Sequence, residues 1–227
     1  MRRLLARLAV VASVSLSGAA ALAAPTGAAL FFETPFLAAL PAGTTLSYSY
    51  RHTTSDPSLG ESFDEKMEMK IEAAPEDAAK RVADVDIFRG SQHREAGPFP
   101  VALGNPLALV LLEREAKEIA QLTKGSPFYI RNRMKEALMN GTAEDIRISY
   151  AGKDVPAWKL DIAPFATDPH KEQLLEIANR RYSFVFSEAV PGGLYEVKVV
   201  TPKADKSGAM IETVVTLSGS TTAAPAP

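Results

Sequence analysis

Side chains that could perform chemistry are few and widely spaced in this sequence. The histidines His52, His93 and His170 form no i,i+4 pair and no His-Glu-x-x-His segment, the spacing that zinc enzymes use. The chain has no cysteine, which excludes disulfides, thiolate metal sites and cysteine nucleophiles. The sequence therefore predicts no metal site and no cofactor.

Local signatures of enzymes are also missing. The chain contains no Gly-x-Ser-x-Gly segment, no phosphate loop and no dinucleotide fingerprint, and no base is spaced to activate Ser187 or Ser207. We therefore predict no catalytic residue and expect that the protein is not an enzyme. A triad assembled only in three dimensions keeps the enzyme alternative open.

One carboxylate falls where an apolar residue is expected. The segment from Asn105-Pro106 to Gly125 has apolar residues at helical spacing, and Glu115 lies in the middle of their stripe. The functional interpretation is a buried acid that binds a ligand, proton or cation. The structural interpretation is an ion pair, or a helix whose apolar stripe passes into solvent at this residue. For an ion pair, Arg131 on the following helix is the expected partner.

The cationic residues do not form one patch. On the second predicted helix Arg133 points well away from Arg131, because successive residues turn by 100°. Arg180 and Arg181 end the third predicted helix, where positive charge complements the helix C-terminus. An anion or lipid-headgroup site is the alternative, but we expect ordinary solvated charge.

The N-terminus predicts export. Arg2, Arg3 and Arg7 precede an apolar stretch, and Ala21-Leu22-Ala23 is typical of a signal-peptide cleavage site. The stretch is shorter and less apolar than the roughly 20 residues that a membrane-spanning helix needs. We expect cleavage near Ala23 and a periplasmic location.

Composition limits the mature chain to one mildly acidic domain. Removal of the three arginines of the signal changes the formal net charge of −2 to −5, which disfavours nucleic acid as a partner. The predicted organisation is a signal peptide at 1–23, an apolar N-terminal segment at 24–43, one domain at 44–217 and a disordered tail at 218–227. In the apolar segment, Thr34-Pro35 predicts the start of a short helix docked on the domain.

Period-two alternation dominates residues 44–217 and predicts strands. The clearest case is 63–72, where Phe63, Met67, Met69 and Ile71 share one face. About eight such strands are joined by hairpins, and three helices interrupt them, the third starting at Asp168-Pro169. The predicted class is α+β: a curved, mostly antiparallel half barrel, with an αα-hairpin and a third helix packed against it.

The faces predicted to point inward carry methionines and aromatic residues. Methionine adapts to varied apolar surfaces, and aromatic side chains supply large contact areas, so these faces suit a ligand pocket as well as a filled core. The Phe31–Leu40 segment could close such a pocket. The tentative ligand-binding residues are Tyr48, Tyr50, Met67, Met69, Glu115, Trp158 and Phe184.

Two resemblances complete the interpretation. The signal peptide, the antiparallel meander and helices on its concave face resemble, in architecture alone, the lipoprotein-carrier type of half barrel in Gram-negative periplasms. Gly104-Asn105-Pro106 and the segment Gly125–Tyr129 are similar to small exported bacterial proteins without assigned function, and this resemblance implies no chemistry. The expected function is a periplasmic binding or carrier module whose partner is a lipid or lipoprotein-like ligand. The alternative is a structural or interaction domain with a filled core that contacts another envelope protein.

Overall fold

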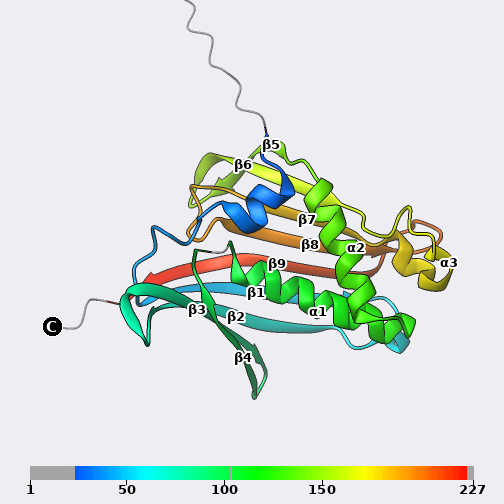
Figure 1. Ribbon diagram of the computed structural model, residues 1–227. Helices are drawn as coiled ribbons and strands as arrows, with labels where there is room; N and C mark the ends of the chain where they lie inside the picture. The colour runs from blue at the N-terminus through cyan, green and yellow to red at the C-terminus, as the bar shows by residue number, and fades with distance from the viewer. Residues whose placement is uncertain (1–23, 103, 224–227) are drawn as a thin grey trace, which may run out of the picture.

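A computed structural model describes residues 24–102 and 104–223, and its α+β class confirms the prediction. Within these residues nine strands form one open antiparallel sheet in the order β4-β3-β2-β1-β9-β8-β7-β6-β5. The sheet is curved, and the helices lie on its concave face (Figure 1). The strands are β1 (Thr44–Thr54), β2 (Phe63–Ala74), β3 (Asp77–Arg89), β4 (Gln92–Pro100), β5 (Glu144–Tyr150), β6 (Lys153–Ile162), β7 (Arg181–Phe186), β8 (Leu194–Pro202) and β9 (Ala209–Thr222).

The order of the strands explains the position of the helices. The first and last strands, β1 and β9, pair in the middle of the sheet, with Tyr48 opposite Leu217. Successive antiparallel strands then extend the sheet outward on both sides, so that β4 and β5 are its two edges. The chain between those edges, helices α1 (Pro106–Thr123) and α2 (Pro127–Asn140), therefore has to cross the sheet (Figure 1).

Both helices begin where the sequence predicts. The Asn105 side chain accepts a hydrogen bond from the Ala108 amide at 3.3 Å, and Ser126 caps α2 in the same way through the Tyr129 amide. Proline follows each cap at the first helical position. The connection between α1 and α2 is short because Lys124 adopts a left-handed conformation, with φ of 56°.

The strand that the sequence did not predict is β4. It is an edge strand with mostly exposed residues, and only Ala96 and Phe99 are half-buried. The alternation on which strand prediction depends is therefore weak here. In β2, by contrast, Met67, Met69 and Ile71 are fully buried, as their alternation predicts.

The N-terminal segment docks on the domain, but the predicted helix start at Thr34-Pro35 is wrong. A short π-helix (Ala29–Glu33) ends at Thr34, whose amide and hydroxyl both donate to the Ala29 carbonyl. The helix forms earlier because it buries Phe31, whose ring packs edge-on against Phe184 at a centroid distance of 4.8 Å. Gly104 permits this approach, since a Cβ there would lie 1.9 Å from the Phe31 carbonyl oxygen.

The predicted disordered tail at 218–227 is wrong for its first part, because β9 continues to Thr222. Thr222 lies opposite Thr44, and the Ala223 amide donates to the Gly43 carbonyl at 3.0 Å. The start of β1 supplies the backbone partners that order these polar residues. Residues 224–227 lie outside the described part of the chain.

The third predicted helix is shorter than a full amphipathic helix. It consists of α3 (Lys171–Leu174) followed by a 3-10 turn at Leu175–Asn179. Leu175 adopts a positive φ of 49° and is 76% exposed, so its side chain does not join the core. Asp168 accepts a hydrogen bond from the His170 amide at 2.8 Å just before this segment.

The described helices include none that is long and apolar enough to cross a membrane. The signal peptide predicted at 1–23 lies outside the described residues.

Candidate functional site

Most of the residues predicted to bind a ligand lie in the packed core. Tyr48, Met67, Met69 and Phe184 are at most 1% exposed, and Tyr50 is 2% exposed. The hollow beside Tyr50, Glu115 and Phe184 measures about 10 Å³, which is room for one water molecule. Trp158 is half-buried on β6, opposite Phe186. The sequence therefore predicts correctly which side chains point inward, but these side chains fill the interior.

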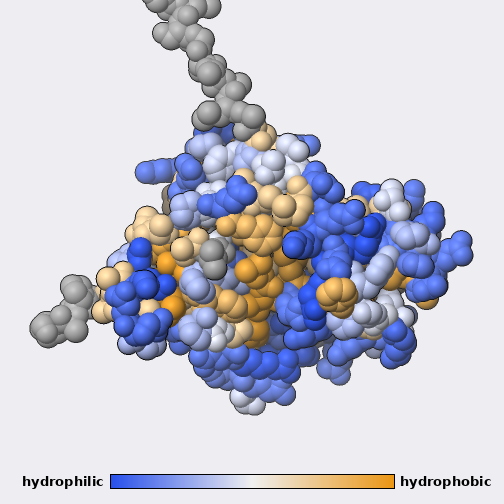
Figure 2. Space-filling view, in the orientation of Figure 1, coloured by the Kyte–Doolittle hydropathy of each residue, from blue (hydrophilic) through white to orange (hydrophobic). Residues whose placement is uncertain are grey.

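A larger groove lies between α1 and the part of the sheet formed by β2, β3 and β4. Its volume is about 740 Å³, within the range of ligand pockets in proteins. We call it the α1–β4 groove. Figure 2 shows hydrophobic side chains across the middle of this face of the molecule, with hydrophilic side chains around them.

Apolar side chains from the sheet and from α1 line part of the α1–β4 groove, beside charged and polar ones. The sheet contributes Phe63, Ile87 and Phe99, which are half-buried, and α1 contributes Leu109 and Val110. Ala96 on β4 leaves space between these larger side chains. The groove exists because β3 and β4 extend beyond the edge of α1, so that part of their concave face has no helix over it (Figure 1).

The charged residues along the α1 side of the groove are held in ion pairs. Arg114 makes two hydrogen bonds to the Glu65 carboxylate, the longer at 3.2 Å, and stacks over the Tyr50 ring at 4.4 Å. Glu113 pairs with Lys117 and with Arg131. These pairs fix one side of the groove and neutralise its charge.

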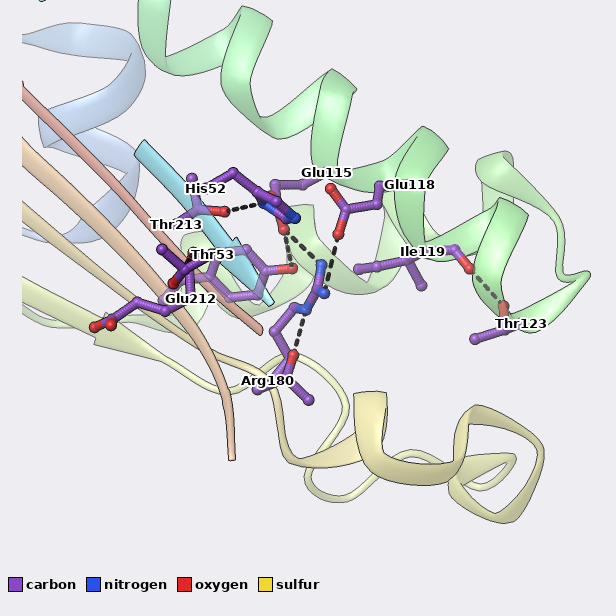
Figure 3. Close-up of polar contacts among 11 residues, drawn as sticks. His52, Thr53, Glu115, Glu118, Ile119, Thr123, Arg180, Glu212 and Thr213 are labelled. Carbon is purple, nitrogen blue, oxygen red and sulfur yellow. Dashed lines mark hydrogen bonds and ion pairs between the residues drawn. The ribbon is translucent and has the colours of Figure 1, made fainter. Parts of the chain in front are cut away.

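A buried polar network lies between α1 and the sheet (Figure 3). Arg180 is 1% exposed and donates to Glu115 at 2.9 Å, to Glu118 at 3.1 Å and to the Thr201 hydroxyl at 2.7 Å. The Tyr182 hydroxyl donates to Glu115 at 3.3 Å. Glu118 also lines the groove and thereby joins the network to it.

The network corrects two predictions. The partner of Glu115 is Arg180, not Arg131, which pairs with Glu113 near the surface. Arg180 is also not a solvated charge at a helix end, because the chain enters β7 at Arg181 and the preceding side chain points into the core. Arg181, its neighbour, is exposed as predicted.

Burial controls the ionisation of the groups near the groove. Loss of hydration raises the pKa of Glu115 to about 7, although the positive charge of Arg180 acts in the opposite direction. Burial lowers the pKa of His52, which lines the groove and forms a hydrogen bond of 3.0 Å with Thr213. Burial also raises the pKa of Tyr50, whose hydroxyl has no hydrogen-bond partner among the described residues.

The arrangement offers contacts for binding but no reactive centre that we can identify. Within residues 24–102 and 104–223, no three side chains of the metal-binding types are grouped closely enough to hold an ion. Ser187 donates to the Pro156 carbonyl at 2.7 Å, a bond that fixes a turn. What the groove provides is apolar surface with charged groups at its margins.

Sequence reasoning missed the groove because its residues look unremarkable in one dimension. Arg89 continues the alternation of Val85 and Ile87, a signal that could have placed it on the inward face. Glu113 and Arg114 lie off the apolar stripe of α1, which normally indicates solvent. This side of α1 lines a groove only because β3 and β4 extend beyond the helix.

Comparison with known proteins adds no family to this description. No family model matches the chain, and no curated protein matches its sequence.

Proposed function

We propose that this protein is an exported binding or carrier module of the periplasm that holds an apolar or amphipathic ligand in the α1–β4 groove. The observation that carries the proposal is the groove itself: its volume is about 740 Å³, and Phe63, Ile87, Phe99 and two aliphatic residues of α1 are among the residues that line it. Partly apolar grooves of this size are typical of ligand-binding sites.

The domain is compatible with removal of residues 1–23. Pro25 is already bonded into the fold, since its carbonyl accepts a hydrogen bond from the Ala143 amide at 3.0 Å. Thr26 forms a bridge with Thr142 next to it. Cleavage after Ala23 would therefore leave these contacts intact, which supports the proposed export.

The proposal is tested by titration with phenylnaphthylamine, an uncharged aromatic probe whose fluorescence rises in an apolar environment. Wild-type protein should bind it saturably. Ala96→Trp fills the groove with a large side chain and should abolish binding, whereas Ala79→Trp, at an exposed position on β3 outside the groove, should leave it unchanged. Far-ultraviolet circular dichroism would show that all three proteins are folded.

The second candidate is a structural or interaction domain of the cell envelope. It is favoured by the packed interior, where Tyr48, Met67 and Met69 leave no room for a ligand. Absence of saturable probe binding to folded wild-type protein would refute the carrier proposal and favour this second candidate.

A further inference from the structure

Within the part of the chain that the structure describes, three charged side chains of the α1–β4 groove have no ionic partner, and two of them are arginines on the β3–β4 hairpin. Glu65, Glu113 and Glu118 are paired with Arg114, Lys117 and Arg180. Among the described residues, neither Arg89 nor Arg94 has a carboxylate within 4.0 Å. Glu61, the third, is exposed in the loop before β2.

The register of the hairpin brings the two arginines to one end of the groove. Arg94 lies opposite Ile87, and Arg89 lies opposite Gln92, so the arginines are diagonal neighbours on the same face of the sheet. Diagonal neighbours of this kind have Cα atoms about 7–8 Å apart, within reach of long side chains. Two guanidinium groups can therefore contact the same small anion.

Arg89 is also held in position. Its guanidinium lies 3.7 Å from the centroid of the ring of Phe63, one of the apolar side chains that line the groove. A stacked guanidinium keeps its donor edge available for hydrogen bonds. The contact joins the cationic end of the groove directly to its apolar surface.

We infer that the ligand of the groove is an anionic amphiphile, with its apolar part against Phe63, Phe99 and Val110 and its anionic head group between Arg89 and Arg94. This inference rests on the proposed function and names the chemical class of the ligand. Planar guanidinium groups bind carboxylate and phosphate oxygens in the same bidentate geometry, so either head group satisfies the site.

The test compares two probes with the same aromatic skeleton. Anilinonaphthalene sulfonate carries one negative charge, and phenylnaphthylamine carries none. Wild-type protein should bind the sulfonate about tenfold more tightly, because each exposed charge pair contributes a few-fold in affinity and two act together. The preference should decrease as salt is added, since both arginines are exposed.

Arg89→Gln/Arg94→Gln should remove this preference, because it removes both positive charges, whereas a change in the shape of the groove would alter the affinity for both probes alike. Arg51→Gln/Arg181→Gln is the matched control: it makes the same change in net charge at exposed positions outside the groove and should preserve the preference. Arg89→Lys/Arg94→Lys, which keeps the charge without the planar group, should retain part of it.

The outcomes separate the two proposals. If folded wild-type protein binds neither probe, the proposed function fails. If it binds phenylnaphthylamine but has no preference for the sulfonate, or if the double glutamine variant keeps the preference, the groove is a binding site and the anionic head group is refuted. Competition by decanoate, decyl phosphate and decanol identifies the head group, and equal displacement by decanol would also overturn the inference.

Discussion

Replacement of Arg180 tests whether the buried network between α1 and the sheet is an ion pair that the fold requires. Arg180→Met keeps most of the apolar volume but leaves Glu115, which is 5% exposed, without its positive partner. Removal of one member of a buried pair costs about 3–5 kcal/mol. Because small domains are typically stable by about 5–15 kcal/mol, we expect a large decrease in the urea midpoint.

The measurement is urea unfolding at pH 8, followed by the fluorescence of Trp158 and by circular dichroism. Glu115→Leu/Arg180→Met should recover most of the lost stability, because neither charge then remains buried. The loss caused by Arg180→Met should also be smaller at pH 5, where the Glu115 carboxyl binds a proton instead. Equal midpoints for Arg180→Met and the double variant would show that removal of the Glu115 carboxylate recovers no stability, and would refute this account of the network.

Three further predictions follow from the same contacts. The raised pKa of Glu115 means that the fold favours its protonated form, so the stability it contributes is present in full below its usual pKa of 4.5 and is lost as the pH rises through about 7. This amounts to about 3 kcal/mol, measured as the difference in pH dependence between wild type and Glu115→Gln, and identical profiles would contradict it. Phe31→Ala should lower the free energy of unfolding by about 3–5 kcal/mol because the ring is fully buried. Phe128→Ala is the control and should have little effect, because Phe128 is 67% exposed. Similar urea midpoints for both variants would show that the N-terminal segment does not contribute to the core. N-terminal sequencing of the exported protein should begin at or near Ala24, and an intact Met1 in a membrane fraction would contradict cleavage.

Local patterns were sufficient to predict the class of the fold. The caps at Asn105 and Ser126 fixed the starts of α1 and α2, and the alternation of Met67, Met69 and Ile71 fixed the buried face of β2. These features depend on neighbours a few residues away, which the sequence displays directly. The short helix at Ala29–Glu33 was missed because its position depends on the distant ring of Phe184.

The functional groups depended on long-range arrangement, and there the sequence was less informative. The apolar stripe of α1 is enough to identify Glu115 as anomalous. Its partner Arg180, however, lies 65 residues away in the sequence and is adjacent to the exposed Arg181. Which of Arg180 and Arg181 points inward depends on where β7 begins. The groove depends on how far β3 and β4 extend beyond α1, and no local pattern encodes that distance.

The most direct test of the central claim is to locate bound phenylnaphthylamine on the protein by nuclear Overhauser effects to assigned methyl groups. The account predicts contacts from the probe to the methyls of Ala96, Leu109 and Val110 in the α1–β4 groove, and none to the buried methyls of Met67 and Met69. Contacts to Met67 and Met69 would instead show that the interior opens to admit the ligand, and would contradict a binding site in the groove.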